Sequence, residues 1–193
     1  SINTQNAFGG GTADQGKTNI TASDAQTADQ ITVAQASEAG SFTAEGVYPG
    51  HKEVAAIKVT AKSAQSTAPN VKITYNTTTN DFADGSLKIS LYRKDTEETI
   101  SANYFQCEKK SVESKLYEEC AKDETALGTS LVSTDIVKAT TAYTLTASNK
   151  VNVSTTGADT FYYVVVEFID TKADQNAGAS GKSLAGQVKV EVV

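Results

Sequence analysis

The stretch Phe161–Ile169, FYYVVVEFI, is a nearly continuous run of apolar residues. It is rich in β-branched and aromatic side chains, which favour strands over helices. A strand with one face in water alternates apolar and polar residues, whereas a strand covered on both faces has no need to. The stretch therefore predicts either a central strand covered on both faces or a long strand that crosses the core.

Around this stretch, apolar and polar residues alternate along several segments. Such a period of two indicates half-buried strands in antiparallel sheets. The alternating positions are Ile31 and Val33; Ala55, Ile57, Val59 and Ala61; Val71, Ile73 and Tyr75; Leu87, Ile89 and Leu91; Tyr143 and Leu145; Val151 and Val153; and Val188, Val190 and Val192. Turn-forming pairs such as Pro49-Gly50 and Asp84-Gly85 separate these segments. The pattern predicts an all-β fold, a sandwich of two antiparallel sheets.

One segment departs from the period of two. Val112, Leu116 and Cys120 recur every fourth residue between charged neighbours. This spacing predicts a short amphipathic helix at about 108–122, inserted between strands. A disulfide between Cys107 and Cys120 would staple it at its base and close a loop of about 14 residues, which the chain-entropy model values at about 3 kcal/mol. Two buried free thiols are the alternative.

The charge balance excludes several classes of partner. The 193 residues include 17 Lys and Arg against 23 Asp and Glu, for a net charge of -6. Nucleic acid and anionic membranes attract basic proteins, so we expect neither as a partner. No apolar run approaches the roughly 20 residues that a membrane-spanning helix needs. The acidity of the chain is typical of a highly soluble protein.

The composition also suggests an extracellular protein. The chain has no Met, begins at Ser1 and is rich in Ser, Thr, Ala and Gly. We expect a cleaved signal peptide and secretion, although removal of an initiator Met before Ser1 would leave the same start. An even cysteine count fits the oxidising conditions outside the cell.

The N-terminal residues differ in composition from the rest of the chain. Ile2, Thr4, Asn6 and Phe8 share one face if residues 1–8 are extended. Gly9, Gly10 and Gly11 follow and form a hinge. Residues 1–12 would then be a short strand on a flexible tether, made to pair elsewhere, and residues 13–193 a single sandwich domain. A frayed terminus is the alternative.

A phosphate-binding motif is present in sequence but not in context. Gly11–Thr18, GTADQGKT, matches GxxxxGK[ST], and the apolar stretch Val164–Asp170 resembles the strand that ends in a magnesium-binding Asp. A P-loop, however, follows a buried strand and precedes a helix. Neither flank of the motif predicts such an element, so a P-loop NTPase is the least favoured hypothesis.

Other catalytic and metal sites find little support. The only histidine, His51, follows the Pro49-Gly50 turn and is expected to be exposed. The sequence contains neither HExxH nor GxSxG. Acidic pairs with calcium-binding chemistry are expected to be solvated loop charges instead. These pairs are Asp81 with Asp84, Asp170 with Asp174, and Glu118 with Glu119. We therefore expect no enzyme activity, no catalytic residue, no metal and no cofactor.

Three sequons permit N-glycosylation if the protein is secreted. They begin at Asn19, Asn76 and Asn152. About two would arise by chance in a chain so rich in Thr and Ser.

The order of segments in the N-terminal part resembles a known family, the TasA/camelysin-type biofilm fibre proteins and the related archaeal bundling pilins. The segments that carry the resemblance are Ala7–Asp14 (AFGGGTAD), the strand at Ile31 and Val33, the turn Gly46–Gly50 (GVYPG), and the strands at 55–59 and 71–75. The resemblance covers roughly the first 75 residues and the β-rich layout. At His51 the family often has an acidic residue.

The resemblance implies a jelly-roll-like sandwich whose subunits join by donor-strand complementation. Each subunit would give residues 1–8 to a sheet of the next, with Gly9–Gly11 as the hinge. The chain would then be a subunit of an extracellular pilus or fimbrium on the cell surface, serving biofilm formation or cell contact. Its partner would be itself, in a head-to-tail homopolymer, and the resemblance leaves open whether the filaments bundle laterally. A monomeric cell-surface adhesin module is the alternative.

Overall fold

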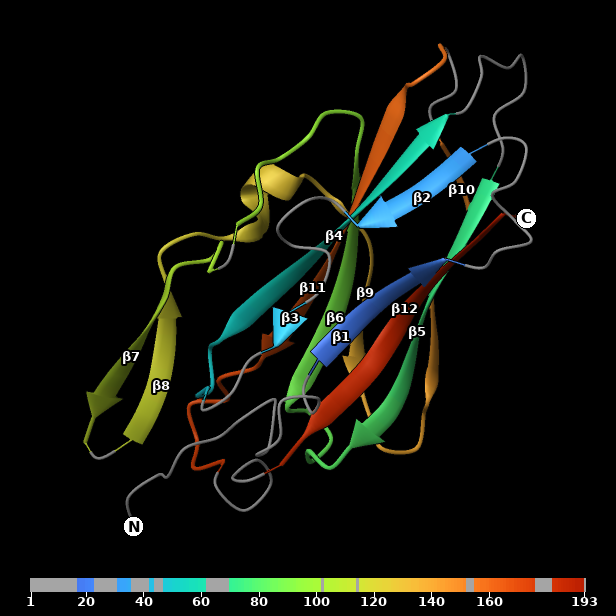
Figure 1. Ribbon diagram of the computed structural model, residues 1–193. Helices are drawn as coiled ribbons and strands as arrows, with labels where there is room; N and C mark the ends of the chain where they lie inside the picture. The colour runs from blue at the N-terminus through green and yellow to red at the C-terminus, as the bar shows by residue number, and fades with distance from the viewer. Residues whose placement is uncertain are drawn as a thin grey trace.

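Strand β11 (Asp159–Phe168) lies at the centre of a five-stranded sheet in the computed structural model (Figure 1). The structure describes residues 17–22, 31–35, 42–43, 47–61, 70–101, 103–113, 115–151, 155–175 and 182–192. The strand order in this sheet is β2-β4-β11-β6-β9. The other four strands are β2 (Ile31–Gln35), β4 (Lys52–Ala61), β6 (Leu87–Lys94) and β9 (Ser130–Ile136). All of its neighbouring strands run antiparallel.

A second five-stranded sheet packs against the first, in the order β10-β5-β12-β1-β3. Its strands are β1 (Lys17–Ala22), β3 (Phe42–Thr43), β5 (Asn70–Asn80), β10 (Ala142–Lys150) and β12 (Leu184–Val192). Side chains from both sheets form one core cluster, which includes Ile57, Ile73, Ile89 and Val188. The predicted all-β antiparallel sandwich is therefore confirmed.

The crossing from β9 to β10 is fixed by one tyrosine. The hydroxyl of Tyr143 accepts a hydrogen bond from the backbone N of Val137 at 2.8 Å. It lies 3.1 Å from each of two carbonyl oxygens, those of Val137 and Thr140, to which it can donate. The hydroxyl of this buried side chain thus provides hydrogen-bond partners for backbone groups of the loop that connects the two sheets.

The side chains of β11 alternate between two cores. Tyr162, Val164, Val166 and Phe168 point into the core between the sheets. The residues between them, Phe161, Tyr163 and Val165, lie in a second apolar cluster on the outer face of the same sheet. Since successive side chains of a strand face opposite sides, only two apolar environments can accommodate so continuous a run. The predicted central strand covered on both faces is confirmed.

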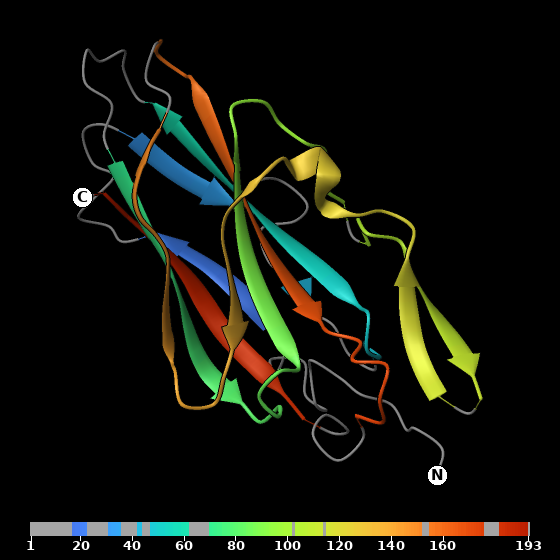
Figure 2. The ribbon, with the colours of Figure 1, turned by 180° about the vertical axis from the view of Figure 1, so that it is seen from behind.

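The long connection between β6 and β9 provides the cover for that outer face. Residues 95–129 contribute Ile100, Tyr104, Phe105 and Leu127 to the second cluster. The hydroxyl of Tyr163 accepts a hydrogen bond from the backbone N of Glu98 at 2.8 Å, so its polar end is satisfied within this cover. Figure 2, which views the molecule from the opposite side to Figure 1, shows this connection next to the sheet. The two strands within the connection extend away from the sandwich.

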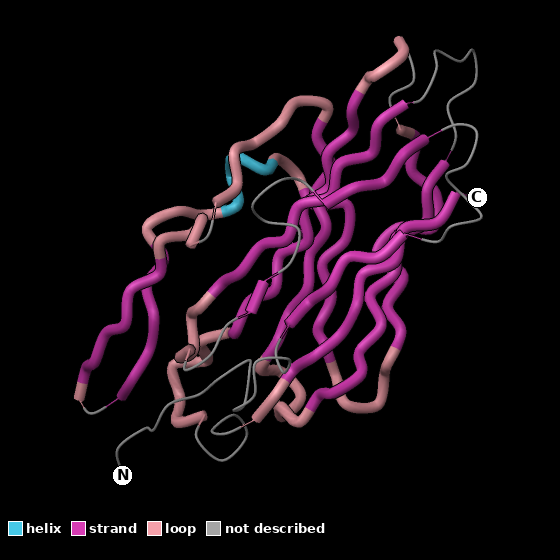
Figure 3. Tube along the Cα trace, viewed as in Figure 1, coloured by secondary structure: helices cyan, strands magenta, loops and turns pink. Residues whose placement is uncertain are grey.

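The predicted helix at about 108–122 is wrong. The segment is a β-hairpin of β7 (Cys107–Val112) and β8 (Lys115–Cys120), and Figure 3 shows it in the colour of strands. A short 3-10 helix, Glu124–Leu127, follows the hairpin and is the one helical turn in the described part of the chain. A spacing of four residues is an even number, so it satisfies the period of a strand as well as that of a helix. Most of β7 is exposed, which explains its charged sequence.

Candidate functional site: the edge at β1 and the base of the β7–β8 hairpin

Strand β1 brings the beginning of the described chain beside its end. It pairs in parallel with β12, in a register from Thr18 opposite Gly186 to Ala22 opposite Val190. Every other strand pair among the described residues is antiparallel. Parallel pairs are slightly less stable per residue than antiparallel ones. The pairing of β1 with β12 is thus an exception within the described part of its sheet.

Within the described ranges, the outer edge of β1 is paired over only part of its length. Strand β3 has two residues and pairs with Lys17 and Thr18. From Asn19 to Ala22, β1 has a ladder partner within the described residues on the β12 side only. An edge of this kind presents backbone N–H and C=O groups that another strand can bind.

Most of the predicted N-terminal site lies outside the described residues. This holds for the donor residues Ile2, Thr4, Asn6 and Phe8, for the hinge Gly9, Gly10 and Gly11, and for the first six residues of the phosphate-binding motif. The last two residues of that motif, Lys17 and Thr18, begin strand β1. A P-loop has a helix at this position, so the structure removes the local context that the NTPase hypothesis needs.

Two of the three sequons fall in one row of the second sheet. Asn19 of β1 is opposite Gln187 of β12, and Gln187 is opposite Asn76 of β5. Asn76 is half-buried on the strand, in the alternating row that points away from the core. Asn152 lies outside the described residues.

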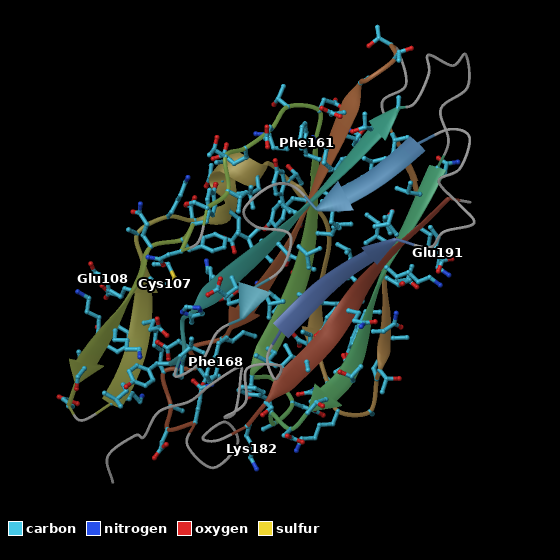
Figure 4. The ribbon with its side chains drawn as sticks, viewed as in Figure 1. Cys107, Glu108, Phe161, Phe168, Lys182 and Glu191 are labelled. Carbon is cyan, nitrogen blue, oxygen red and sulfur yellow. A yellow bond between two sulfur atoms is a disulfide. The ribbon has the colours of Figure 1, made fainter. Side chains whose placement is uncertain are left out.

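The predicted disulfide is present at the base of the hairpin. Cys107 and Cys120 are opposite each other in the β7–β8 register and are bonded, with an S–S distance of 2.02 Å. Figure 4 shows Cys107 where the hairpin meets the rest of the molecule. The Sγ atom of Cys120 lies 3.3 Å from the carbonyl oxygen of Gly50. The disulfide therefore closes the hairpin at the point where it contacts the turn before β4.

The turn Val47–Gly50 and strand β8 approach each other very closely. The backbone N of Glu118 donates to the carbonyl of Pro49 at 2.7 Å, and the N of Gly50 donates to Phe168 of β11 at 2.6 Å. Gly50 has a φ of 103°, and a Cβ at this position would lie 2.1 Å from the carbonyl oxygen of Glu118. Only glycine fits here, both because of its backbone angle and because of the contact.

A buried histidine lies between two carboxylates at this junction. The Nδ1 of His51 is 2.9 Å from Oε1 of Glu118, and its Nε2 is 2.7 Å from Oε1 of Glu53. The other oxygen of Glu118 accepts a hydrogen bond from the backbone N of Tyr48 at 2.6 Å. Burial lowers the pKa of His51, but hydrogen bonds and charges from Glu118 and Glu53 outweigh it and raise the pKa to about 9.

Two predictions about these charged residues are wrong. His51, expected to be exposed, is only 8% exposed, and Glu118, expected to be a solvated loop charge, is 6% exposed. The strand context was the missing signal, because in β8 Glu118 points towards the sandwich while its neighbour Glu119 is exposed. The expectation holds for Asp81, Asp84 and Asp174, which are exposed.

A cleft of about 370 Å³ lies between the hairpin and the loop after β11. Its lining includes Val112, Lys115, Tyr117, Glu119, Asp170 and Lys172. One ion pair lies within this lining, with the Nζ of Lys172 2.8 Å from Asp170, and the Nζ of Lys115 donates to the backbone carbonyl of Lys172. The lining thus presents mixed charge rather than one sign.

No protein-family model matches the chain, and no curated protein sequence matches it. Among the residues that the structure describes, no helix has the length and apolar character needed to span a membrane. The same residues contain no group of three or more His, Cys, Asp or Glu side chains that could hold a metal ion.

Proposed function

We propose that the protein is a structural subunit of an extracellular filament that polymerises by adding a strand of one copy to a sheet of the next. The observation that carries the proposal is the edge of β1, whose residues Asn19–Ala22 have a ladder partner on one side only among the described residues. The strand sits next to β12 as a parallel addition to an otherwise antiparallel sheet. A free strand with the right alternation can extend such an edge.

The sequence offers such a strand in residues 1–8, followed by three glycines. An eight-residue strand would add about six to eight backbone hydrogen bonds, each worth roughly 1 kcal/mol net. Burial of Ile2 and Phe8 would add about 1.5–3 kcal/mol each. The donor and the edge are different surfaces, so the contact is heterologous and produces an open filament rather than a closed dimer.

The disulfide supports a place outside the cell. Cytosolic thiols are kept reduced, whereas disulfides persist in secreted and surface proteins. The Cys107–Cys120 bond closes an exposed hairpin, as is common in such proteins. We place the filament at the cell surface for this reason.

Electron microscopy and light scattering of the full-length protein test the proposal. We expect filaments from the intact chain and none after deletion of residues 1–8. Phe8→Asp should also prevent growth, because it places a charge on the face that would be buried. Ala7→Asp is the matched control, since it introduces the same charge on the opposite face of the donor.

A synthetic peptide of residues 1–8 separates strand addition from other effects of the deletion. The peptide should bind the deleted protein and should slow filament growth by the intact one. Filaments that grow equally well without residues 1–8, or a monomer at every concentration, would refute the proposal.

A monomeric surface-binding module is the second candidate. It is favoured by the hairpin, which projects from one end of the sandwich in both ribbon views, and by the cleft beside it. Under this hypothesis, replacing Cys107–Cys120 by a short Gly-Ser linker would abolish adhesion to cells, whereas deletion of residues 1–8 would leave it unchanged.

A further inference from the structure

The β7–β8 hairpin depends on its base for a fixed position. Its two strands form a sheet of their own in the described structure. A two-stranded hairpin is only marginally stable in water by itself. At its base, the strands are held to the sandwich by Glu118 and Cys120, which contact the turn at Tyr48, Pro49 and Gly50. Further out, the Nζ of Lys115 donates to the carbonyl of Lys172 in the loop after β11. The position of the base of the hairpin therefore depends on a few contacts at this junction.

The carboxylate of Glu118 is the centre of these contacts. Its side chain is 4% exposed, and its two oxygens have different partners, the backbone N of Tyr48 and the Nδ1 of His51. A buried carboxylate is costly unless both its charge and its oxygens are satisfied. Removal of the His51 contact would leave a buried charge with only a backbone donor.

The ring of His51 can satisfy both carboxylates only when it carries a proton on each nitrogen. An imidazolium has two N–H donors, whereas neutral imidazole has one donor and one acceptor. In either neutral tautomer, a lone pair would face the oxygen of Glu118 or of Glu53, at 2.9 or 2.7 Å. The geometry therefore requires the charged ring.

We propose that His51 is a proton-operated latch: its imidazolium bridges Glu53 of β4 and Glu118 of β8, and loss of the proton releases the base of the hairpin from the sandwich. The latch is independent of the filament proposal, because it concerns the position of the hairpin within one subunit.

Other charged groups around the junction have partners of their own. On β7, the ammonium of Lys109 lies 4.9 Å from the centre of the Tyr48 ring. On β4, Lys52 pairs with Glu124 at 3.2 Å, and on β11, Glu167 pairs with Lys88 at 3.2 Å. The two carboxylates that contact the ring thus account for the raised pKa of His51, which is about 9.

NMR titration of the intact, oxidised protein tests the latch. The chain contains one histidine, so its ring C–H signals are unambiguous. We expect them to titrate with a midpoint near 9. The amide signals of Tyr48 and Glu118 should shift with the same midpoint, and hydrogen-exchange protection in β7 and β8 should fall about tenfold or more as the base opens.

Three variants make the test specific. Glu118→Gln should lower the midpoint of His51 by about one unit or more and abolish the pH-dependent shift of the Tyr48 amide. Glu53→Gln, at the more exposed side of the ring, should lower the midpoint too and serves if the first variant does not fold. Glu119→Gln, next to Glu118 but exposed, should leave the midpoint unchanged.

A His51 midpoint close to the ordinary histidine pKa of 6.5 in the wild type would overturn the proposal. So would a hairpin whose amide shifts and protection stay constant while His51 loses its proton, because the ring would then titrate without controlling the hairpin.

Discussion

The Nδ1 atom of His51 lies 2.9 Å from Oε1 of Glu118, although 67 residues separate the two in the chain. The contact joins the turn before β4 to a hairpin that is inserted much later in the sequence. It also places an ionisable ring in a buried setting where its protonation and the fold depend on each other.

The stability of the protein should fall at alkaline pH because of His51. Its pKa is 6.5 in the unfolded chain and about 9 in the folded protein, a difference worth about 3 kcal/mol. Since the folded state holds the proton more tightly, this contribution is fully present below pH 6.5 and is lost as the pH rises through 9. Urea unfolding gives the free energy of unfolding of wild type and His51→Gln at each pH between about 6 and 10. The difference between the two proteins should shrink towards the alkaline end. A difference in free energy of unfolding that stays constant over this range would contradict the raised pKa of His51.

Substitution of Gly50 should be much more harmful than substitution of another glycine with positive φ. Gly85 has a φ of 89° and open space around its missing Cβ, so Gly85→Ala tests backbone strain alone, at about 1–3 kcal/mol. Gly50→Ala adds a clash with the carbonyl of Glu118, worth about 1–3 kcal/mol more. Thermal unfolding of the two variants measures the difference. Equal losses of stability in the two variants would mean that the base of the hairpin moves to accommodate the added Cβ without cost.

Removal of the Tyr143 hydroxyl should weaken the crossing between the sheets. Tyr143→Phe leaves the backbone N of Val137 without its partner, at a cost of about 1–3 kcal/mol. Tyr92→Phe is a suitable control, because Tyr92 is also 8% exposed but its hydroxyl makes no hydrogen bond to another described residue. Chemical denaturation should separate the two variants, and a loss of similar size in both would argue against a special role for Tyr143.

Loss of the disulfide should destabilise the hairpin. Cys107→Ala with Cys120→Ala removes a cross-link that closes a loop of about 14 residues, for which chain entropy predicts about 3 kcal/mol. Exchange protection in β7 and β8 should fall before the sandwich unfolds. Reduced wild-type protein should behave like the double variant; an unchanged hairpin after reduction would show that the junction alone is sufficient.

The sandwich could be predicted from the sequence because its signals are local. The continuous run in β11 indicates cover on both faces, and alternation in β5 and β12 indicates one buried face each. The hairpin could not be predicted in the same way. Leu116 and Cys120, both on β8, have a spacing that fits strand and helix alike, and the turn before them contains no Asn-Gly or Asp-Gly pair that would favour a hairpin.

The junction at His51 was beyond prediction for another reason. Its partners, Glu53 and Glu118, come from strands that only the folded chain brings together. A lone histidine after a Pro-Gly turn resembles an exposed loop residue, and nothing in the neighbouring sequence indicates the carboxylate that covers it. The disulfide, by contrast, could be predicted from two cysteines and their spacing.

The pairing of β1 with β12 also has a consequence for the order of folding. The first strand of the described chain cannot complete its sheet until the last strand has left the ribosome, because β12 is its long partner. At about 5–20 residues per second, synthesis of the intervening chain of roughly 160 residues takes about 8–32 seconds. Contacts between such distant residues also form slowly once the chain is complete. Strand β1 thus remains available to other partners, chaperones included, until β12 has been synthesised.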